Sequence, residues 1–160
     1  MKTIKKIICA ISLLAFAFSA LSCEEKRSAY SVMSEFCLGY RLESTIYHPA
    51  ANEWDAGFHN PKSFMELYGV DISFVEDYAV VLNSGVGGVS ECGVFFCYSD
   101  RDAFSVYTML EKRKELIRSS SAYLDVSAIE DAFIMKRGRV VVISVLSDNE
   151  RAMALWKKIL

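Results

Sequence analysis

Two histidines and two carboxylates lie close together in the chain, at His48, Glu53, Asp55 and His59. Imidazole nitrogens and carboxylate oxygens are ligands that zinc and other divalent cations take from proteins. The spacing of these residues, however, matches no familiar zinc signature. We therefore predict no catalytic residue, no metal ligand and no cofactor. A hydrolase or metal-dependent enzyme centred on His48, Asp55 and His59 is kept as the alternative.

The segment around these residues favours binding over catalysis. Residues 40–60 show neither a helical nor a strand period, so we expect a long irregular loop there. Irregular segments are where recognition residues most often lie. We expect Trp54 and Phe58 to pin this loop onto the core. The candidate residues for contact with a ligand or partner are His48, Trp54, Asp55 and His59.

Two other patterns are better explained by structure than by catalysis or phosphate binding. The serine-containing stretches lack the G-x-S-x-G sequence of a nucleophile elbow. The glycine-rich run at 84–88 resembles a phosphate-binding loop, but such a loop needs a helix directly after it, and here a strand follows. We predict that this run connects two strands of a hairpin.

The cysteines do not form the even set that a disulfide framework needs. Cys9 falls in the hydrophobic N-terminal stretch, and if Cys23 is modified as argued below, three cysteines remain. Cys92 and Cys97 are five residues apart in a predicted strand, so their side chains point to opposite faces and cannot pair. A bridge from Cys37 to either of them stays open. We favour the interpretation that all three are small buried hydrophobic residues.

The periodicity of the chain predicts a single α+β domain over residues 29–160. A hairpin followed by a helix occurs twice in the second half, and each helix follows an S-x-x-[DE] capping box, at 99–102 and 147–150. We expect a four-stranded, mainly antiparallel sheet with helices on one face, preceded by one or two N-terminal helices. The predicted helices are 29–38, 61–68, 100–119 and 149–159, and the predicted strands are 78–82, 92–98, 133–135 and 140–146.

Local signals also predict where the first helices begin and end. Gly39 is expected to end the first, while Asn60 should cap the second and Gly69 end it. The core-facing side of the second helix is predicted to be Phe64, Leu67 and Tyr68.

The helix at 100–119 carries a charged, mainly basic surface that we expect to face solvent. Its residues are Lys112, Arg113, Lys114, Glu115 and Arg118. Such a surface could lie against anionic lipid headgroups. Because glutamates are interleaved and the domain is acidic, a solvated helix face is the interpretation we prefer.

The N-terminus has the three-part layout of a secretory leader. Three lysines precede an apolar run at 7–18, which is shorter than a spanning helix needs, and small residues follow. We predict a signal peptide over residues 1–22 and a polar tether over residues 23–28. Without the leader the chain holds 15 basic and 20 acidic residues, a net charge of −5, which argues against a nucleic-acid partner.

The residues before Cys23 resemble the lipobox of bacterial lipoproteins, in which a small residue precedes a cysteine that becomes diacylated. Ala20 stands where leucine is usual and Leu21 where a small residue is commoner, so ordinary leader cleavage before Cys23 also fits. We favour lipidation of Cys23, which would hold the domain stably at a membrane.

Short motifs from Phe64 to the C-terminus resemble a bacterial family of small secreted lipoproteins built on a domain of unknown function. The motifs are Leu67-Tyr68-Gly69-Val70-Asp71, Glu76-Asp77-Tyr78-Ala79-Val80, Gly93-Val94-Phe95 and the strand pair around Arg137-Gly138. The resemblance implies a leader, a lipid anchor and a mixed α/β domain, and no activity. We expect a non-enzymatic protein on the outer face of the cytoplasmic membrane, or alternatively a freely secreted one, that binds an envelope protein or a small ligand.

Overall fold

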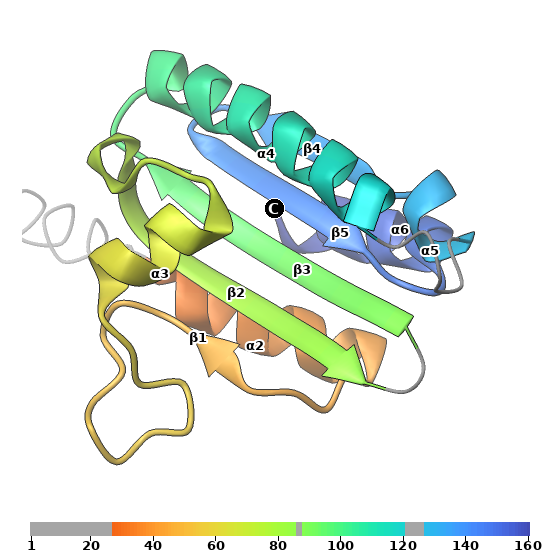
Figure 1. The fold of residues 1–160 in the computed structure, drawn as a ribbon, viewed down its shortest axis with the longest axis horizontal. Helices are drawn as coiled ribbons and strands as arrows, with labels where there is room; N and C mark the ends of the chain where they lie inside the picture. Colours follow the sequence, from red (N-terminus) through yellow and green to blue (C-terminus); the bar gives the residue numbers. More distant parts are fainter. Residues whose placement is uncertain (1–26, 86–87, 121–126) are drawn as a thin grey trace, which may run out of the picture.

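The centre of the molecule is an antiparallel sheet with the strand order β1-β2-β3-β5-β4 (Figure 1). The computed structural model describes residues 27–85, 88–120 and 127–160. The predicted α+β class is confirmed, and the β2–β3 and β4–β5 hairpins join neighbouring strands as expected. The strands are β1 (Ile46–Tyr47), β2 (Val75–Gly85), β3 (Gly88–Cys97), β4 (Phe133–Arg137) and β5 (Val140–Val145).

The prediction of four strands omitted β1. This two-residue strand lies at the edge of the sheet, where Ile46 pairs with Val81 and Tyr47 with Val80. Two residues are too few to show a strand period, so only the pairing with β2 identifies the strand. β1 therefore interrupts the segment expected to be one continuous loop.

Helices cover both faces of the sheet, so the prediction of helices on one face was wrong. In Figure 1, α2 (Ala29–Tyr40) and α6 (Asn149–Ile159) lie behind the sheet, and α3 (Pro61–Tyr68) and α4 (Asp100–Ser120) lie in front. The shorter elements are the 3-10 helix η1 (Ile72–Phe74) and α5 (Ser127–Glu130). The reason for two covered faces is that central strands such as β5 are buried at successive positions, which requires apolar cover on each side.

Each face of the sheet has its own hydrophobic core. The core toward α4 includes Tyr78, Phe95, Val106, Leu110 and Ile143, and the core toward α2 and α6 includes Phe36, Val81, Val94, Val142 and Trp156. The rings of Phe36 and Trp156 stack with centroids 4.2 Å apart, which joins α2 to α6.

Helix α3 begins and ends at the predicted residues. The Asn60 side chain accepts a hydrogen bond from the Ser63 amide at 3.0 Å, and Gly69 ends the helix with a φ of 86°. The predicted core face was wrong in one place, since Leu67 is exposed and Met65 is buried instead.

Helix α2 continues past Gly39, contrary to the prediction. A Cβ atom at this position would lie 3.0 Å from Leu155 Cδ2 on α6, so the glycine allows the two helices to approach closely. The chain leaves the helix at Arg41, which has a φ of 63°.

Of the two predicted capping boxes, the one at 99–102 is present in part: Ser99 caps α4, and the Asp102 carboxylate contacts the Ser99 hydroxyl. The Asp102 amide donates to Ser99 Oγ at 3.1 Å, and that hydroxyl donates to Asp102 Oδ2 at 2.6 Å. At the start of α6 the cap is Asp148, whose Oδ1 accepts from the Arg151 amide at 2.9 Å. The predicted box at 147–150 was therefore wrong, because the adjacent carboxylate takes the capping position.

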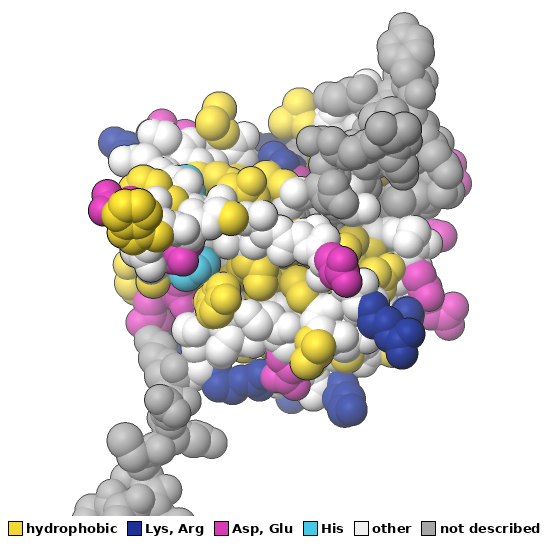
Figure 2. All heavy atoms as spheres, turned by 90° about the horizontal axis from the view of Figure 1, so that it is seen from below, with side chains coloured by type: hydrophobic (Ala, Val, Ile, Leu, Met, Phe, Trp, Pro, Cys, Tyr) yellow, Lys and Arg dark blue, Asp and Glu magenta, His cyan; other side chains and the backbone are white. Residues whose placement is uncertain are grey.

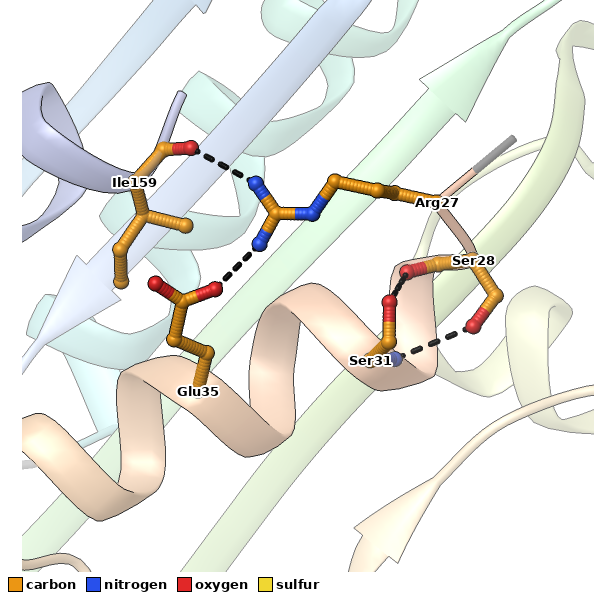
Figure 3. Close-up of polar contacts among 5 residues, drawn as sticks. All are labelled: Arg27, Ser28, Ser31, Glu35 and Ile159. Atoms are coloured by element: carbon orange, nitrogen blue, oxygen red, sulfur yellow. Dashed lines mark hydrogen bonds and ion pairs between the residues drawn. The ribbon is translucent and has the colours of Figure 1, made fainter. Parts of the chain in front are cut away.

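The start of the described chain is attached to the end of α6 (Figure 3). Arg27 Nη1 donates to the Ile159 carbonyl at 3.1 Å, and Nη2 pairs with the Glu35 carboxylate. Ser28 caps α2 by accepting from the Ser31 amide at 3.1 Å. The predicted leader at 1–22 and Cys23 lie outside the described residues. None of the helices within the described ranges is both long enough and apolar enough to span a bilayer.

Candidate functional site

A pocket of about 400 Å³ lies between the first turn of α2 and the chain on either side of β1. The residues that line it are Tyr30, Ser44, Thr45, Ile46, His48, Asp55, Ala56 and Gly57. This lining combines an aromatic ring, an imidazole and a carboxylate. A concave surface with a few convergent polar groups is typical of a site for a small ligand or for a side chain of a partner.

His48 packs against α2 through its ring. The centroids of the His48 and Tyr30 rings are 4.4 Å apart. Partial burial lowers the pKa of His48 below its ordinary value, although the carboxylates of Asp55 and Asp77 act to raise it. The neutral imidazole is therefore favoured at pH 7, and it offers one donor and one acceptor to a ligand.

Asp55 organises a tight turn beside the pocket. Its Oδ2 accepts from the Asn52 amide at 2.9 Å, and its carbonyl accepts from the Phe58 amide at 2.9 Å. The Asn52 side chain in turn accepts from the Trp54 amide at 3.0 Å. One carboxylate oxygen of Asp55 thus serves the turn, and the side chain stays at the surface where a ligand can reach it.

Gly57 allows this turn to lie directly against β1. A Cβ atom on Gly57 would be 2.2 Å from the Ile46 carbonyl oxygen, which is closer than any side chain permits. The absence of a side chain here, rather than an unusual backbone angle, brings the two walls of the pocket together.

His59 holds the loop against β2 and α3 and does not line the pocket. Its Nδ1 lies 2.6 Å from the Gly57 carbonyl and its Nε2 lies 2.5 Å from the Tyr78 hydroxyl. Because a carbonyl only accepts, Nδ1 carries a proton and donates it to Gly57, and in the neutral ring Nε2 accepts from the Tyr78 hydroxyl. The His59 ring also packs against Phe64 at 4.5 Å and Tyr47 at 5.8 Å between centroids. Both nitrogens are therefore engaged within the domain.

The four predicted contact residues fall into different surroundings. His48 and Asp55 share the pocket, His59 is part of the support beneath it, and Trp54 lies outside it at the surface. Glu53 is also exposed. Within residues 27–85, 88–120 and 127–160, no three histidine, cysteine or acidic side chains are placed to hold a metal ion together.

Trp54 and Phe58 do not pin the loop to the core, contrary to the prediction. The two side chains are 87% and 56% exposed. The aromatic side chains that attach the loop are instead those of Tyr47, His59 and Phe64. Figure 2, which views the domain from below Figure 1, shows hydrophobic side chains beside both histidines at the left of the molecule. Large exposed aromatic side chains of this kind mark contact surfaces.

A second pocket of about 480 Å³ lies between the end of α3 and α4. Its charged residues are Lys62, Glu66, Asp71 and Lys112, two of each sign, and no aromatic ring lines it. We centre the candidate site on the first pocket because its lining is chemically more varied.

Arg113 does not lie on the solvated face of α4, contrary to the prediction. It pairs with the buried Glu91 of β3, lies 3.8 Å above the Tyr68 ring centroid, and donates from Nη1 to the Tyr68 carbonyl at 3.0 Å. Burial, and then the Glu91 carboxylate, raise the pKa of Tyr68 well above its ordinary value. The signal for this contact was present, since Arg113 follows Leu110 by three residues and precedes Ile117 by four, on the buried stripe.

The three described cysteines are free, buried thiols. Cys92 and Cys37 belong to the core toward α2, and Cys97 belongs to the core toward α4, which confirms the opposite faces predicted for Cys92 and Cys97. Burial raises the pKa of Cys37 to about 11.

No protein family, curated protein or solved structure was found to match this chain. The resemblance to secreted lipoproteins therefore stays a prediction, and the pocket and its surroundings are the basis for a function.

Proposed function

We propose that this chain is an exported, membrane-tethered protein that binds a small polar ligand, or a side chain of an envelope protein, in the pocket lined by Tyr30, His48 and Asp55. The observation that carries the proposal is the pocket itself, in which these three side chains converge from α2 and the two sides of the loop. Binding requires only complementary contacts, and the pocket supplies stacking, hydrogen-bonding and charged groups.

The state of each group supports binding over catalysis. A general base needs a hydrogen-bonded partner that orients it, and His48 meets Tyr30 through a ring contact with an angle of 42° between the planes. Asp55 uses one oxygen to hold the turn, and His59 uses both nitrogens to hold the loop. These contacts make a preformed surface, which lowers the entropy cost of binding.

The tether is proposed from the sequence. The leader and the lipobox-like residues place Cys23 at the new N-terminus, and the Ser28 cap begins the folded helix five residues later. A diacylated cysteine would then hold the pocket on the outer face of the cytoplasmic membrane.

Intact mass spectrometry of the protein from membranes of its own host tests the tether. A chain that begins at Cys23 and carries a diacylglycerol adduct would support it. A bare chain in the culture medium would contradict it and leave a freely secreted protein.

NMR titration of the chain from Cys23 onward tests the pocket. Envelope extracts, separated into soluble metabolite and protein fractions, are added, and we expect one fraction to shift the resonances of Tyr30 and His48. His48→Ala and Asp55→Asn should abolish the shifts, while Lys112→Ala in the second pocket should leave them unchanged. Shifts that persist in both pocket variants would overturn the proposed site. The absence of shifts with every fraction would overturn it as well.

A further inference from the structure

Three exposed aromatic residues belong to the first turn of α2 and to the loop that lines the pocket beside that turn. We call Tyr30, Trp54 and Phe58 the aromatic surface. Tyr30 is 45% exposed and belongs to the first turn of α2, and the other two side chains are more exposed still. Exposed apolar side chains on neighbouring segments are typical of a surface that contacts a partner or a membrane.

Contacts within the domain hold the aromatic surface next to the start of α2. The Ala29 amide donates to Asp77 Oδ2 at 2.7 Å, which holds the first turn of the helix against β2. The ring contact between Tyr30 and His48 then holds the loop against that turn. In Figure 1 the loop after β1 and the beginning of α2 lie at the same end of the sheet.

The length of the tether limits how far this end can lie from Cys23. Cys23 and Arg27 are four positions apart, and four extended residues span at most about 14 Å. Arg27 is itself attached to α6 and Glu35. If Cys23 carries a lipid, as the proposed function states, the start of α2, which carries Tyr30, is held close to the headgroups.

We propose that the aromatic surface docks into the headgroup region of the same bilayer that holds the Cys23 lipid. Tryptophan and tyrosine are enriched at this depth because their rings are amphipathic. A second membrane contact of this kind adds to the lipid and sets the orientation of the domain. The pocket beside Tyr30 then opens at the membrane surface, so its ligand is a molecule that the membrane carries or concentrates.

The charged residues beside the aromatic surface determine how deeply it enters the bilayer and which lipid headgroups it prefers. Glu53 and Asp55 flank Trp54, so the loop stays among the headgroups and favours zwitterionic over anionic lipid. The basic residues of α4 belong to the opposite face of the sheet from α2, so they do not supply this contact (Figure 1).

Phosphatidylcholine vesicles that contain a maleimide lipid test the docking without native lipidation. The chain from Cys23 onward is coupled through the Cys23 thiol, since the other three cysteines are buried. The chain has two tryptophans, and Trp156 is buried, so a change in emission reports Trp54. We expect a shift to shorter wavelength and quenching by lipid brominated near the headgroup. Both effects should weaken when phosphatidylglycerol replaces part of the phosphatidylcholine.

The matched control moves the exposed tryptophan to another place. In Trp54→Phe/Leu116→Trp the probe lies near the far end of α4, at a residue that is also exposed. We expect no shift and no quenching there. Equal quenching at both positions, quenching at neither, or stronger quenching on anionic vesicles would overturn the docking.

The two experiments distinguish failure of the tether from failure of the docking. A native chain without lipid would overturn the tether, and the docking proposal with it, whatever the vesicles show. A lipidated native chain whose Trp54 is not quenched on coupled vesicles would leave the tether in place and overturn the docking alone.

Discussion

Arg113 and Glu91 form a two-pronged ion pair between α4 and β3, with distances of 2.6 Å for both Nε–Oε1 and Nη2–Oε2. The Glu91 side chain is 2% exposed, and its Oε1 also accepts from the Tyr68 hydroxyl at 2.6 Å. The carboxylate is therefore removed from water, and its hydrogen bonds to Arg113 and Tyr68 offset the cost of burying it.

Replacing Arg113 should make the domain much less stable toward unfolding. In Arg113→Met the Glu91 carboxylate stays buried without its counter-charge, and we expect a loss of about 3–5 kcal/mol in the free energy of unfolding. Urea unfolding followed by circular dichroism measures this. Arg113→Lys should lose less, because the charge is kept and only the fork of two hydrogen bonds is lost.

The double variant Arg113→Met/Glu91→Leu separates two contributions to the loss of stability: the missing ion pair and the buried carboxylate left without a counter-charge. It should be more stable than Arg113→Met, because apolar replacement of both partners removes the unpaired carboxylate. The Tyr68 hydroxyl, left without its acceptor, should limit the recovery. A double variant less stable than Arg113→Met would contradict this account.

Gly57→Ala should displace the loop from β1. The added methyl group meets the Ile46 carbonyl, and relief of such a clash costs about 1–3 kcal/mol. The hydrogen bond between His59 and the residue 57 carbonyl should break, which NMR of the His59 ring would detect. Gly69→Ala is the control, since it adds backbone strain of about 1–2 kcal/mol at a positive φ but leaves the loop in place. An unchanged His59 environment in Gly57→Ala would refute the close approach.

The buried thiols should resist alkylation until the domain unfolds. Burial raises the pKa of Cys37 to about 11 and that of Cys97 to about 12, and it raises the pKa of Cys92 well above its ordinary value. At pH 7 little thiolate is present to react. Mass spectrometry after iodoacetamide treatment of the chain from Arg27 onward should find three unmodified cysteines in buffer and three modified ones in urea. Rapid modification in buffer would show that a thiol is accessible.

His48 should titrate below the ordinary histidine range, and Asp55→Asn should lower its pKa further by removing an attractive carboxylate. NMR titration of the His48 ring measures both. Because the folded domain binds this proton less readily than the unfolded chain does, stability should fall as the pH drops through the unfolded pKa. His48→Gln should flatten that part of the stability profile. A pKa for His48 above the ordinary range would contradict the effect of burial and would reverse the expected change of stability with pH.

Features that depend on neighbouring residues could be predicted from the sequence. The two hairpins, the Asn60 and Ser99 caps and the opposite faces of Cys92 and Cys97 each follow from residues a few positions apart. Local hydrogen bonds and the two-residue strand period operate over that range, so the pattern suffices. The leader and Cys23 are also predictions from local pattern alone.

Features that join distant residues were decided only by the tertiary structure. β1 forms because Ile46 pairs with Val81 of β2. The Arg113 side chain is largely buried because it pairs with Glu91, which lies 22 positions earlier in the chain, on β3. His59 takes the anchoring role expected of Trp54 because Tyr78 lies within reach of its ring. A sequence pattern reports which residues are apolar or charged, whereas pairing between distant positions depends on which faces of the sheet the helices cover, and that is settled only when the chain packs.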